Sequence, residues 1–446
     1  MYTSRREQYR EREVPSMISS AVLGCILLVI TLVLFITQWI PATATAIVSI
    51  TLFALTGAAS YNTCVSGFSN NIIIMLVSVL IVGQAMLESG LATLIGQTCF
   101  KLSKGSEKRF LLYIVLSISV MSAFMDNTTT VAVLLPVMAT AVSASKREMN
   151  FMNLVMPASI AAIVGGACLL IGCTVNLTGQ SILTEYTDYA FSVTDFTVAA
   201  LPVLLLFIVY ALTIGYKLGN RIWNKPERRE AEHEAMKKFA CLDSAKPVID
   251  RRKCITMGCI LLAMVCMFLF TDLPLGLSGS IAAMLCVLFR VVDLKRALPK
   301  IDWDVVIRLA CTLGLAAALK ECGFCDLISN AFISVFGSNV SPMIILTVVL
   351  IASNLMSQFI GNSTVVLLLG AAVIPIVVSL GYSPLPVTMA LTLGASFAWM
   401  TPIAGACIGI SFSGGYEFND YARYTWPLTL LMYIVLIIWL PIVFPF

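Results

Sequence analysis

The sequence predicts an all-α polytopic membrane protein: an inverted repeat of two five-crossing halves, each with a re-entrant helical hairpin. Three observations support this fold class. Of the 446 residues, 59% are hydrophobic and 12% are charged, whereas soluble domains carry roughly 25% charged residues. Apolar segments long enough to cross a bilayer recur along the whole chain. Two polar clusters, 122–136 and 357–375, interrupt such segments in the same way, with Asn127 and Asn362 at matching positions.

The composition narrows the classes of function. The formal net charge of +4 is too small to indicate a nucleic-acid partner, and lysines and arginines gather in loops, where they report orientation. The single histidine, His233, lies in a charged segment, which argues against a histidine-based metal site or catalytic triad. Acids within the apolar segments do not pair, so the sequence does not predict an enzyme. Most of the 14 cysteines lie in apolar runs, where they act as small apolar residues.

Apolar segments of crossing length predict the membrane topology. The first is too long for a signal peptide and no cleavage site follows it, so we expect a retained helix. Two further segments are broken near the middle by the polar clusters, and we interpret each as a hairpin that enters and leaves on one side. The ten predicted crossings are 17–37, 42–58, 71–88, 152–187, 194–217, 253–270, 276–292, 303–320, 385–412 and 424–444.

The distribution of positive charge orients the two halves. Basic residues flank the first hairpin at 101–109 and 146–147, which predicts that both of its ends are cytoplasmic. No Lys or Arg lies in the flanks of the second hairpin, 337–342 and 381–384, which fits the opposite side. Each half has an odd number of crossings, so the halves are inverted. This count places the N-terminus outside, although four arginines precede the first crossing.

The same interpretation divides the chain into an arm, two repeats and a linker. The polar arm is 1–16 and the cytoplasmic linker is 218–252. The first repeat, 17–217, comprises scaffold helices 17–88, re-entrant hairpin 110–145 and broken helix 152–187. The second repeat, 253–446, comprises scaffold helices 253–320, re-entrant hairpin 342–380 and broken helix 385–412.

Each hairpin tip is predicted to bring polar groups to membrane depth. Hydrocarbon offers no water, so amides and hydroxyls need partners there. At a helix break, the N-terminus of the half-helix attracts an anion, and unpaired carbonyls hold a cation. Glycine-rich breaks within 161–177 and 394–408 would expose carbonyls beside the tips. The alternative is that Asn, Ser and Thr only join helices, but two matched clusters favour one shared binding site.

Five short motifs carry a resemblance to a known family: WIP at 39–41, SGFSN at 66–70, DNT at 126–128, the glycine-rich stretch 165–176 and GNS at 361–363. Together they resemble the divalent anion/sodium symporters, which carry dicarboxylates, citrate or sulfate. The resemblance implies a homodimer in the lipid bilayer whose transport domain slides against a fixed scaffold, an elevator-type mechanism. It also implies that the two tips bind a small anionic substrate, with contacts from Asn127, Thr128, Asn362 and Ser363.

The resemblance also implies two sodium (Na⁺) sites beside the tips. The first would comprise Ser122, Asp126, Asn127 and Gly172. The second would comprise Ser357, Ile360, Asn362 and Ala404, with Ile360 and Ala404 contributing backbone carbonyls. The serine of the family motif is replaced by Asp126 in the first tip and by Gly361 in the second. The family's prolines are missing from 173–176 and 405–408, so the particular anion stays open.

The presence of Asp126 is compatible with more than one coupling ion, so the sequence does not decide the coupling ion either. An acid at membrane depth is functional by default. Ionised, it would strengthen a sodium site; protonated, it would couple transport to protons (H⁺); a third alternative is a cap on a half-helix. The DNTT sequence also resembles sodium/proton antiporters, so the rival function is a cation/proton antiporter or a proton-coupled anion carrier. No membrane-buried Lys or Arg is identified as an anion partner. The multi-pass protein is expected in the cell membrane, a prokaryotic inner membrane or a plasma membrane.

Overall fold

The structure is a computed structural model that describes residues 19–37, 39–145, 149–223, 228–242, 250–271, 273–337 and 340–446. Within these ranges the chain forms helices joined by turns, and no strand occurs. The predicted all-α class is therefore confirmed. The predicted polar arm, 1–16, lies outside the described residues.

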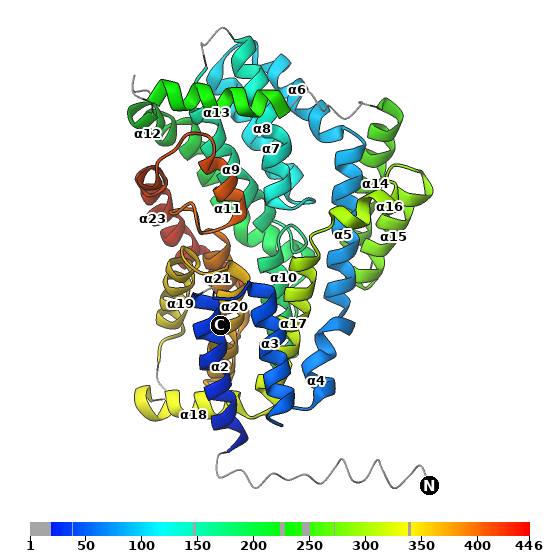
Figure 1. The fold of residues 1–446 in the computed structure, drawn as a ribbon. Helices are drawn as coiled ribbons and strands as arrows, with labels where there is room; N and C mark the ends of the chain where they lie inside the picture. Colours follow the sequence, from blue (N-terminus) through cyan, green and yellow to red (C-terminus); the bar gives the residue numbers. More distant parts are fainter. Residues whose placement is uncertain are drawn as a thin grey trace.

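The first half of the chain forms a helical pair, a long helix, a hairpin and a broken helix (Figure 1, blue to green). The sequence predicted both breaks, at 123–126 in the hairpin and at 168–173 in the broken helix. The elements are α2 (Ser20–Thr37), α3 (Ala42–Leu55), α4 (Tyr61–Val65), η1 (Ser66–Ser69), α5 (Asn71–Glu88), α6 (Leu91–Ser103), α7 (Glu107–Ser122), α8 (Asn127–Ala144), α9 (Met152–Ala167), α10 (Thr174–Tyr186), α11 (Val193–Leu212) and α12 (Ile214–Trp223).

The second half repeats this order after the linker helix α13 (Arg229–Leu242). Its breaks fall at 358–361 and 397–405, again within the predicted segments. The elements are α14 (Arg251–Phe270), α15 (Leu275–Leu288), α16 (Leu294–Ala297), η4 (Leu298–Lys300), α17 (Trp303–Glu321), α18 (Phe324–Phe336), α19 (Pro342–Ser357), α20 (Asn362–Ser379), α21 (Leu385–Ser396), α22 (Ala406–Phe412) and α23 (Phe418–Val443).

Six segments are long and apolar enough to cross a membrane, judged by length and composition within the described residues. Several other predicted crossings are apolar helices of 10–17 residues, so the count of ten crossings stays a prediction. The chain is nevertheless a multi-pass membrane protein. The six segments are Ser20–Thr37, Tyr61–Glu88, Asn127–Ala144, Val193–Leu212, Asn362–Ser379 and Phe418–Val443.

Several corresponding helices of the two halves have equal lengths. Helices α3 and α15 have 14 residues each, α7 and α19 have 16, and α8 and α20 have 18. Pro41 and Pro274 precede α3 and α15, both with φ of −53°. Gly90 and Gly323 precede α6 and α18 with φ of 76° and 81°, a left-handed conformation that favours glycine. The internal repeat inferred from the sequence therefore extends to backbone geometry.

A pair of matched contacts joins the two halves. Glu88, at the end of α5, accepts a hydrogen bond from the backbone N–H of Asp293 at 3.3 Å. Glu321, at the end of α17, accepts one from the backbone N–H of Ser60 at 3.0 Å. Each glutamate thus binds the turn that follows the helical pair of the other half. Exchanging the halves converts one contact into the other, as an internal two-fold relation requires.

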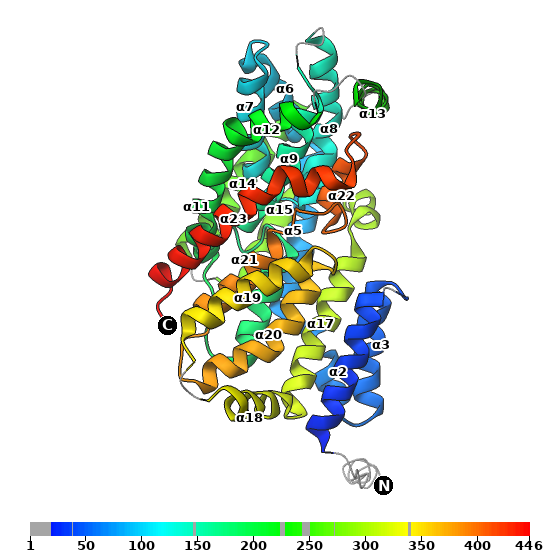
Figure 2. The same ribbon diagram turned by 90° about the vertical axis from the view of Figure 1, so that its left-hand side faces the viewer.

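The two hairpins lie toward opposite ends of the molecule (Figures 1 and 2), with α7 and α8 in the upper half and α19 and α20 in the lower half. Helix α7 packs against α9, as α19 packs against α21. The halves also exchange partners: α5 packs on α15, α3 on α17, α10 on α20 and α8 on α22. The second helix of each hairpin therefore touches the broken helix of the other half.

Three helices of 13 or more residues were not expected from the sequence. Helices α6 and α18, with 13 residues each, connect the scaffold helices to the hairpins. The third, α13, lies in the predicted linker and packs on α8 (Figure 1). The backbone N–H of Phe151 donates to Glu232 of α13 at 2.6 Å, and Arg228 pairs with the buried carboxylate of Asp420. The linker is therefore docked onto the first hairpin and the start of α23.

Candidate functional site

The first hairpin turns between α7 and α8, and its tip is closely packed. The buried hydroxyl of Ser122, the last residue of α7, donates a hydrogen bond of 2.6 Å to Oδ1 of Asn127. Asn127 opens α8 and packs on Gly166, where an added Cβ would lie 2.2 Å from Asn127 Oδ1. Thr128 follows as the second, half-buried residue of α8. These contacts fix the orientation of the Asn127 amide.

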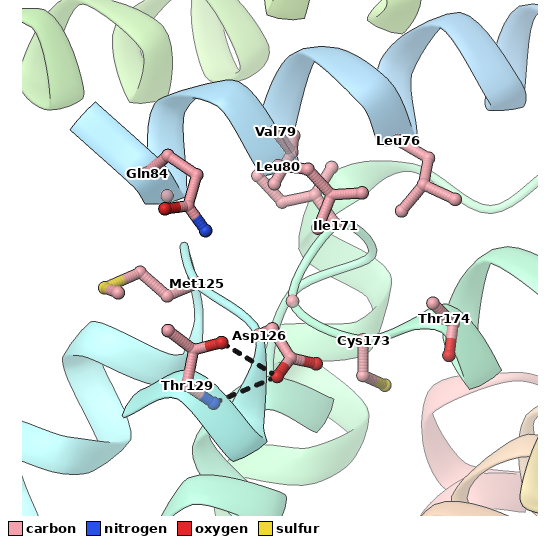
Figure 3. A pocket seen from close by; sticks show the side chains of 12 residues that line it. Leu76, Val79, Leu80, Gln84, Met125, Asp126, Thr129, Ile171, Cys173 and Thr174 are labelled. Atoms are coloured by element: carbon pink, nitrogen blue, oxygen red, sulfur yellow. Dashed lines mark hydrogen bonds between the residues drawn. The ribbon is translucent and has the colours of Figure 1, made fainter. Parts of the chain in front are cut away.

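Asp126 is the N-cap of α8. Its Oδ2 accepts hydrogen bonds from the backbone N–H of Thr129 at 3.0 Å and from its hydroxyl at 3.3 Å (Figure 3). A carboxylate at a helix N-terminus is stabilised by the cap bond and the helix dipole, so the capping role is present. Asp126 is exposed in a cleft shared with Gln84 of α5 and with Gly172 of the first break. Both cap bonds use Oδ2, which leaves Oδ1 available to a cation in this cleft.

The second tip has the same backbone path but different hydrogen bonds. Gly361 is the N-cap of α20 and takes the position of the aspartate. Ser357 is fully buried, and neither its hydroxyl nor Oδ1 of Asn362 has a hydrogen-bond partner within the described part of the chain. The equivalent atoms of the first tip bond to each other. Buried oxygens without a donor cost free energy, so the second tip is suited to a bound cation or ligand.

Each tip also contacts the break of the other half. The hydroxyl of Ser363, in the second tip, lies 3.4 Å from the hydroxyl of Thr174, where α10 begins. The thiol of Cys407, in α22, lies 3.6 Å from the backbone carbonyl of Asn127, in the first tip. The structure therefore places each tip beside the break of the other half.

Buried asparagines stabilise the two breaks. The side-chain amide of Asn176 donates to the carbonyl of Leu169 at 2.8 Å, within the first break. The amide of Asn354 donates to the carbonyls of Gly394 at 2.8 Å and Phe397 at 2.9 Å, beside the second break. Both asparagines are fully buried. The ends of α9 and α21 thus keep hydrogen-bond partners although their helices stop.

Three carbonyls at the predicted cation sites stay free of backbone hydrogen bonds in the described part of the chain: those of Gly172, Ile360 and Ala404. Gly172 and Ala404 are buried. An added Cβ on Gly172 would lie 2.2 Å from the carbonyl oxygen of Gly166, so only glycine fits at this position. Such free carbonyls are suitable ligands for a hard cation. The described residues contain no group of three or more His, Cys, Asp or Glu arranged to hold a metal ion.

A basic residue beside the second tip was missed in the sequence. A cavity of about 400 Å³ lies in front of this tip, between the α2–α3 turn and α17, and Arg308 of α17 lines it together with Ser363. The sequence analysis identified no membrane-buried Lys or Arg as an anion partner and did not consider Arg308. Arg308 lies within the predicted crossing 303–320, and a charge inside an apolar span was the available signal.

The chain matches known transporters in sequence and in fold. The CitMHS citrate transporter family matches residues 32–369 and 281–446. The uncharacterized transporter YfbS of Escherichia coli K12 is 20% identical, over 94% of this chain and 98% of that protein. A 46 kDa membrane protein of Mycobacterium leprae is 24% identical, over 81% of this chain and 84% of the relative.

A solved structure shares the fold. The YdaH transporter of Alcanivorax borkumensis, described as having an unusual topology, matches with a TM-score of 0.55. The match covers 86% of this chain and 87% of YdaH at 14% identity. The likeness at this identity concerns the fold alone. The family match over most of the sequence, together with the transporter relatives and the paired helix breaks, shows that the chain belongs to the CitMHS citrate transporter family.

Proposed function

We propose that this protein is a secondary active transporter that couples sodium to the symport of a small, divalent anion such as a dicarboxylate, citrate or sulfate. The observation that carries the proposal is that each of the two inverted hairpin tips is in contact with the break of the other half. One site bounded by both halves is what alternating access requires. The family's description as citrate transporters makes citrate the first substrate to test.

The proposed substrate site lies at the N-termini of α8 and α20. The substrate contacts are Asn127 and Thr128 from the first tip and Asn362 and Ser363 from the second. The N-terminus of a helix presents free N–H groups and a positive dipole end, which stabilise an anion. Amide and hydroxyl side chains add donors for carboxylate or sulfate oxygens. Two such ends facing one site suit an anion with two charges.

The proposed sodium sites lie beside the tips and are unequal. The first comprises the side chains of Ser122, Asp126 and Asn127 and the carbonyl of Gly172, so it carries one negative charge. The second comprises Ser357, Ile360, Asn362 and Ala404, all of them neutral oxygen ligands. Oxygen ligands suit a hard cation. Sodium in the second site would supply the partner that the buried oxygens of Ser357 and Asn362 lack.

The proposed motion is a slide of the hairpins and broken helices against a scaffold formed by α2–α5 and α14–α17, in a homodimer. Contacts between these two groups of helices would have to break in each cycle. Lys320 of α17 donates to the carbonyl of Glu185 at the end of α10. The hydroxyl of Tyr186 donates to the carbonyl of Ala316 of α17 at 3.1 Å. Such a small number of polar contacts is compatible with exchange between two positions.

Uptake into proteoliposomes tests the proposal directly. Labelled citrate, succinate and sulfate are offered with an inward sodium gradient, with an inward proton gradient and with neither. We expect sodium-driven uptake of at least one anion and its loss in Asn362→Ala. Asn220→Ala is the matched control, because Asn220 lies on α12 and bonds to Asn153, away from the tips. Sodium movement driven by a proton gradient, without any anion uptake, would refute the symporter.

Asp126 supports a second candidate, a proton-coupled anion carrier or a cation/proton antiporter. It is the acid that lines the cleft at the first tip (Figure 3). Asp126→Asn keeps an oxygen for the cap bond and removes the charge. In a sodium symporter this change should abolish the sodium dependence of uptake. In a proton-coupled carrier it should make uptake independent of the proton gradient.

A further inference from the structure

The cavity in front of the second tip contains two sources of positive potential. The guanidinium of Arg308 lines it from α17, and the N-terminus of α20, an 18-residue helix, opens into it at Gly361 and Ser363. Beside Gly361 the space is open: an added Cβ would meet only the hydroxyl of Thr364, at 3.6 Å. The backbone at the tip is therefore accessible to a ligand, as anion binding at a helix N-terminus requires.

The Arg308 guanidinium makes only a weak ion pair within the described part of the protein. Its one ion pair among the described residues is with Asp304, one turn earlier on α17, at 3.9 Å. Asp304 is itself engaged, because its carboxylate accepts the hydroxyl hydrogen of Thr43. A guanidinium has five N–H donors arranged as a fork that matches a carboxylate or sulfate. Most of these donors remain available to an anion in the cavity.

The opposite wall of the cavity is apolar. It is formed by the end of α2 and the start of α3, including Phe35, Ile40 and Pro41. Apolar walls reduce screening by water and strengthen the attraction between an anion and a nearby cationic group. A volume of about 400 Å³ is within the range of sites for small molecules.

The clefts at the two tips differ in charge. The residues that line the cleft of the first tip include the acid Asp126 and no Lys or Arg. The cavity of the second tip is lined by Arg308 and by no acid. The two halves, which agree in the lengths of their hairpin helices, thus diverge in charge where they face the scaffold.

We propose that the cavity in front of the second tip is an anion-binding site in which Arg308 holds a carboxylate or sulfate group of the substrate between the scaffold and Ser363. The site rests on the proposed anion transport and adds a scaffold residue that determines selectivity for anions. Asp304 opposes binding, because it partly neutralises Arg308. Removing the base and removing the acid should therefore shift affinity in opposite directions.

Binding of citrate, succinate and sulfate to the purified, detergent-solubilised protein tests the site by calorimetry at fixed sodium concentration. Arg308→Gln should weaken binding by about tenfold or more, the usual weight of a hydrogen bond to a charged group. The anion affinity of Arg308→Lys should lie between that of the wild type and that of Arg308→Gln. Asp304→Asn should tighten binding by about two- to fivefold, the weight of an exposed ion pair. Arg296→Gln is the matched control, because Arg296 also pairs with a nearby acid, Asp293, but is 80% exposed and lies outside the cavity. This variant should bind the anions with wild-type affinity.

The outcomes separate the two proposals. If the wild type binds an anion and both Arg308→Gln and Asp304→Asn bind it with wild-type affinity, the cavity site is wrong and the transport proposal stands. If both variants bind more weakly, the pair acts through the structure of α17, and the cavity site is again refuted. If the wild type binds none of the three anions, the anion-transport proposal fails and the cavity site with it. Melting temperatures without anion show whether each variant is folded.

Discussion

Asn354 is predicted to be the most important single side chain for the second break. It is fully buried on α19, and its side chain makes three hydrogen bonds shorter than 3.0 Å, besides a longer one of 3.5 Å from the Gln358 amide. Its amide nitrogen donates to the carbonyls of Gly394 and Phe397, at 2.8 and 2.9 Å. Its oxygen accepts from the hydroxyl of Tyr433 at 2.7 Å. Asn354→Ala removes all three bonds and leaves two buried carbonyls and a hydroxyl unpaired.

The expected loss of stability follows from these bonds. Side-chain hydrogen bonds in a membrane protein contribute about 0.6 kcal/mol each on average, which gives a lower estimate of about 2 kcal/mol for three. Leaving a buried polar group unpaired costs about 1–3 kcal/mol, so we expect a total of about 2–4 kcal/mol for Asn354→Ala. Tyr433→Phe removes one of the three bonds and serves as the matched variant, with an expected loss of about 1 kcal/mol.

The free energy of unfolding is measured in bicelles by steric trapping for both variants and the wild type. Citrate uptake into proteoliposomes is measured in parallel, because a shifted break should also displace the carbonyl of Ala404. The reasoning is refuted if Asn354→Ala loses no more stability than Tyr433→Phe, since the two bonds to the break would then contribute nothing.

Further predictions concern the glycines of α9 and the base of the first hairpin. In Gly165→Ala the new Cβ would lie 2.3 Å from backbone atoms of Ser119, so we expect a large drop in melting temperature. In Gly166→Ala its three nearest neighbours would all be atoms of the Asn127 side chain, so the fold should survive while uptake falls; equal stability losses in the two variants would contradict this. Burial raises the pKa of Glu107 above its usual 4.5, although neighbouring donors partly oppose the shift. The free energy of unfolding of the wild type should therefore decrease as pH rises from 4.5 through the raised pKa of the folded state. Glu107→Gln should lack this decrease when the free energy of unfolding is measured across the same pH range.

The sequence predicted the elements that interrupt helices better than the helices that lie on surfaces. The breaks and both tips were found because polar residues and glycines stand out against an apolar background. Helices α6, α13 and α18 were missed because each is short or amphipathic and carries polar residues, so it does not stand out as a crossing. Their stability comes from docking, as for α13 on α8, and docking is a tertiary contact that a single sequence does not display.

The two charged residues at the site illustrate a second limit. The sequence identified Asp126 but left sodium coupling, proton coupling and capping open. The structure shows the cap, which any of these functions can include. Arg308 was passed over because its importance depends on its distance from a tip more than 50 positions away in the chain. Only the fold places α17 beside the start of α20, where the arginine shares a cavity with Ser363.

The difference in charge between the clefts at the two tips also makes the two halves of the inverted repeat unequal. Two identical halves would present equivalent clefts in the two positions of a sliding transport domain, so neither ion would prefer one tip. Here the cleft of the first tip is lined by an acid of that tip, whereas the cavity in front of the second tip is lined by a base of the scaffold helix α17 and by the N-terminus of α20. If the protein is the proposed symporter, we expect a cation to favour the cleft of the first tip and an anion to favour the cavity of the second, although the backbones of the tips are nearly the same. In the proposed symporter, this separation would favour co-transport of opposite charges, because neither ion would have to enter through a cleft that repels it.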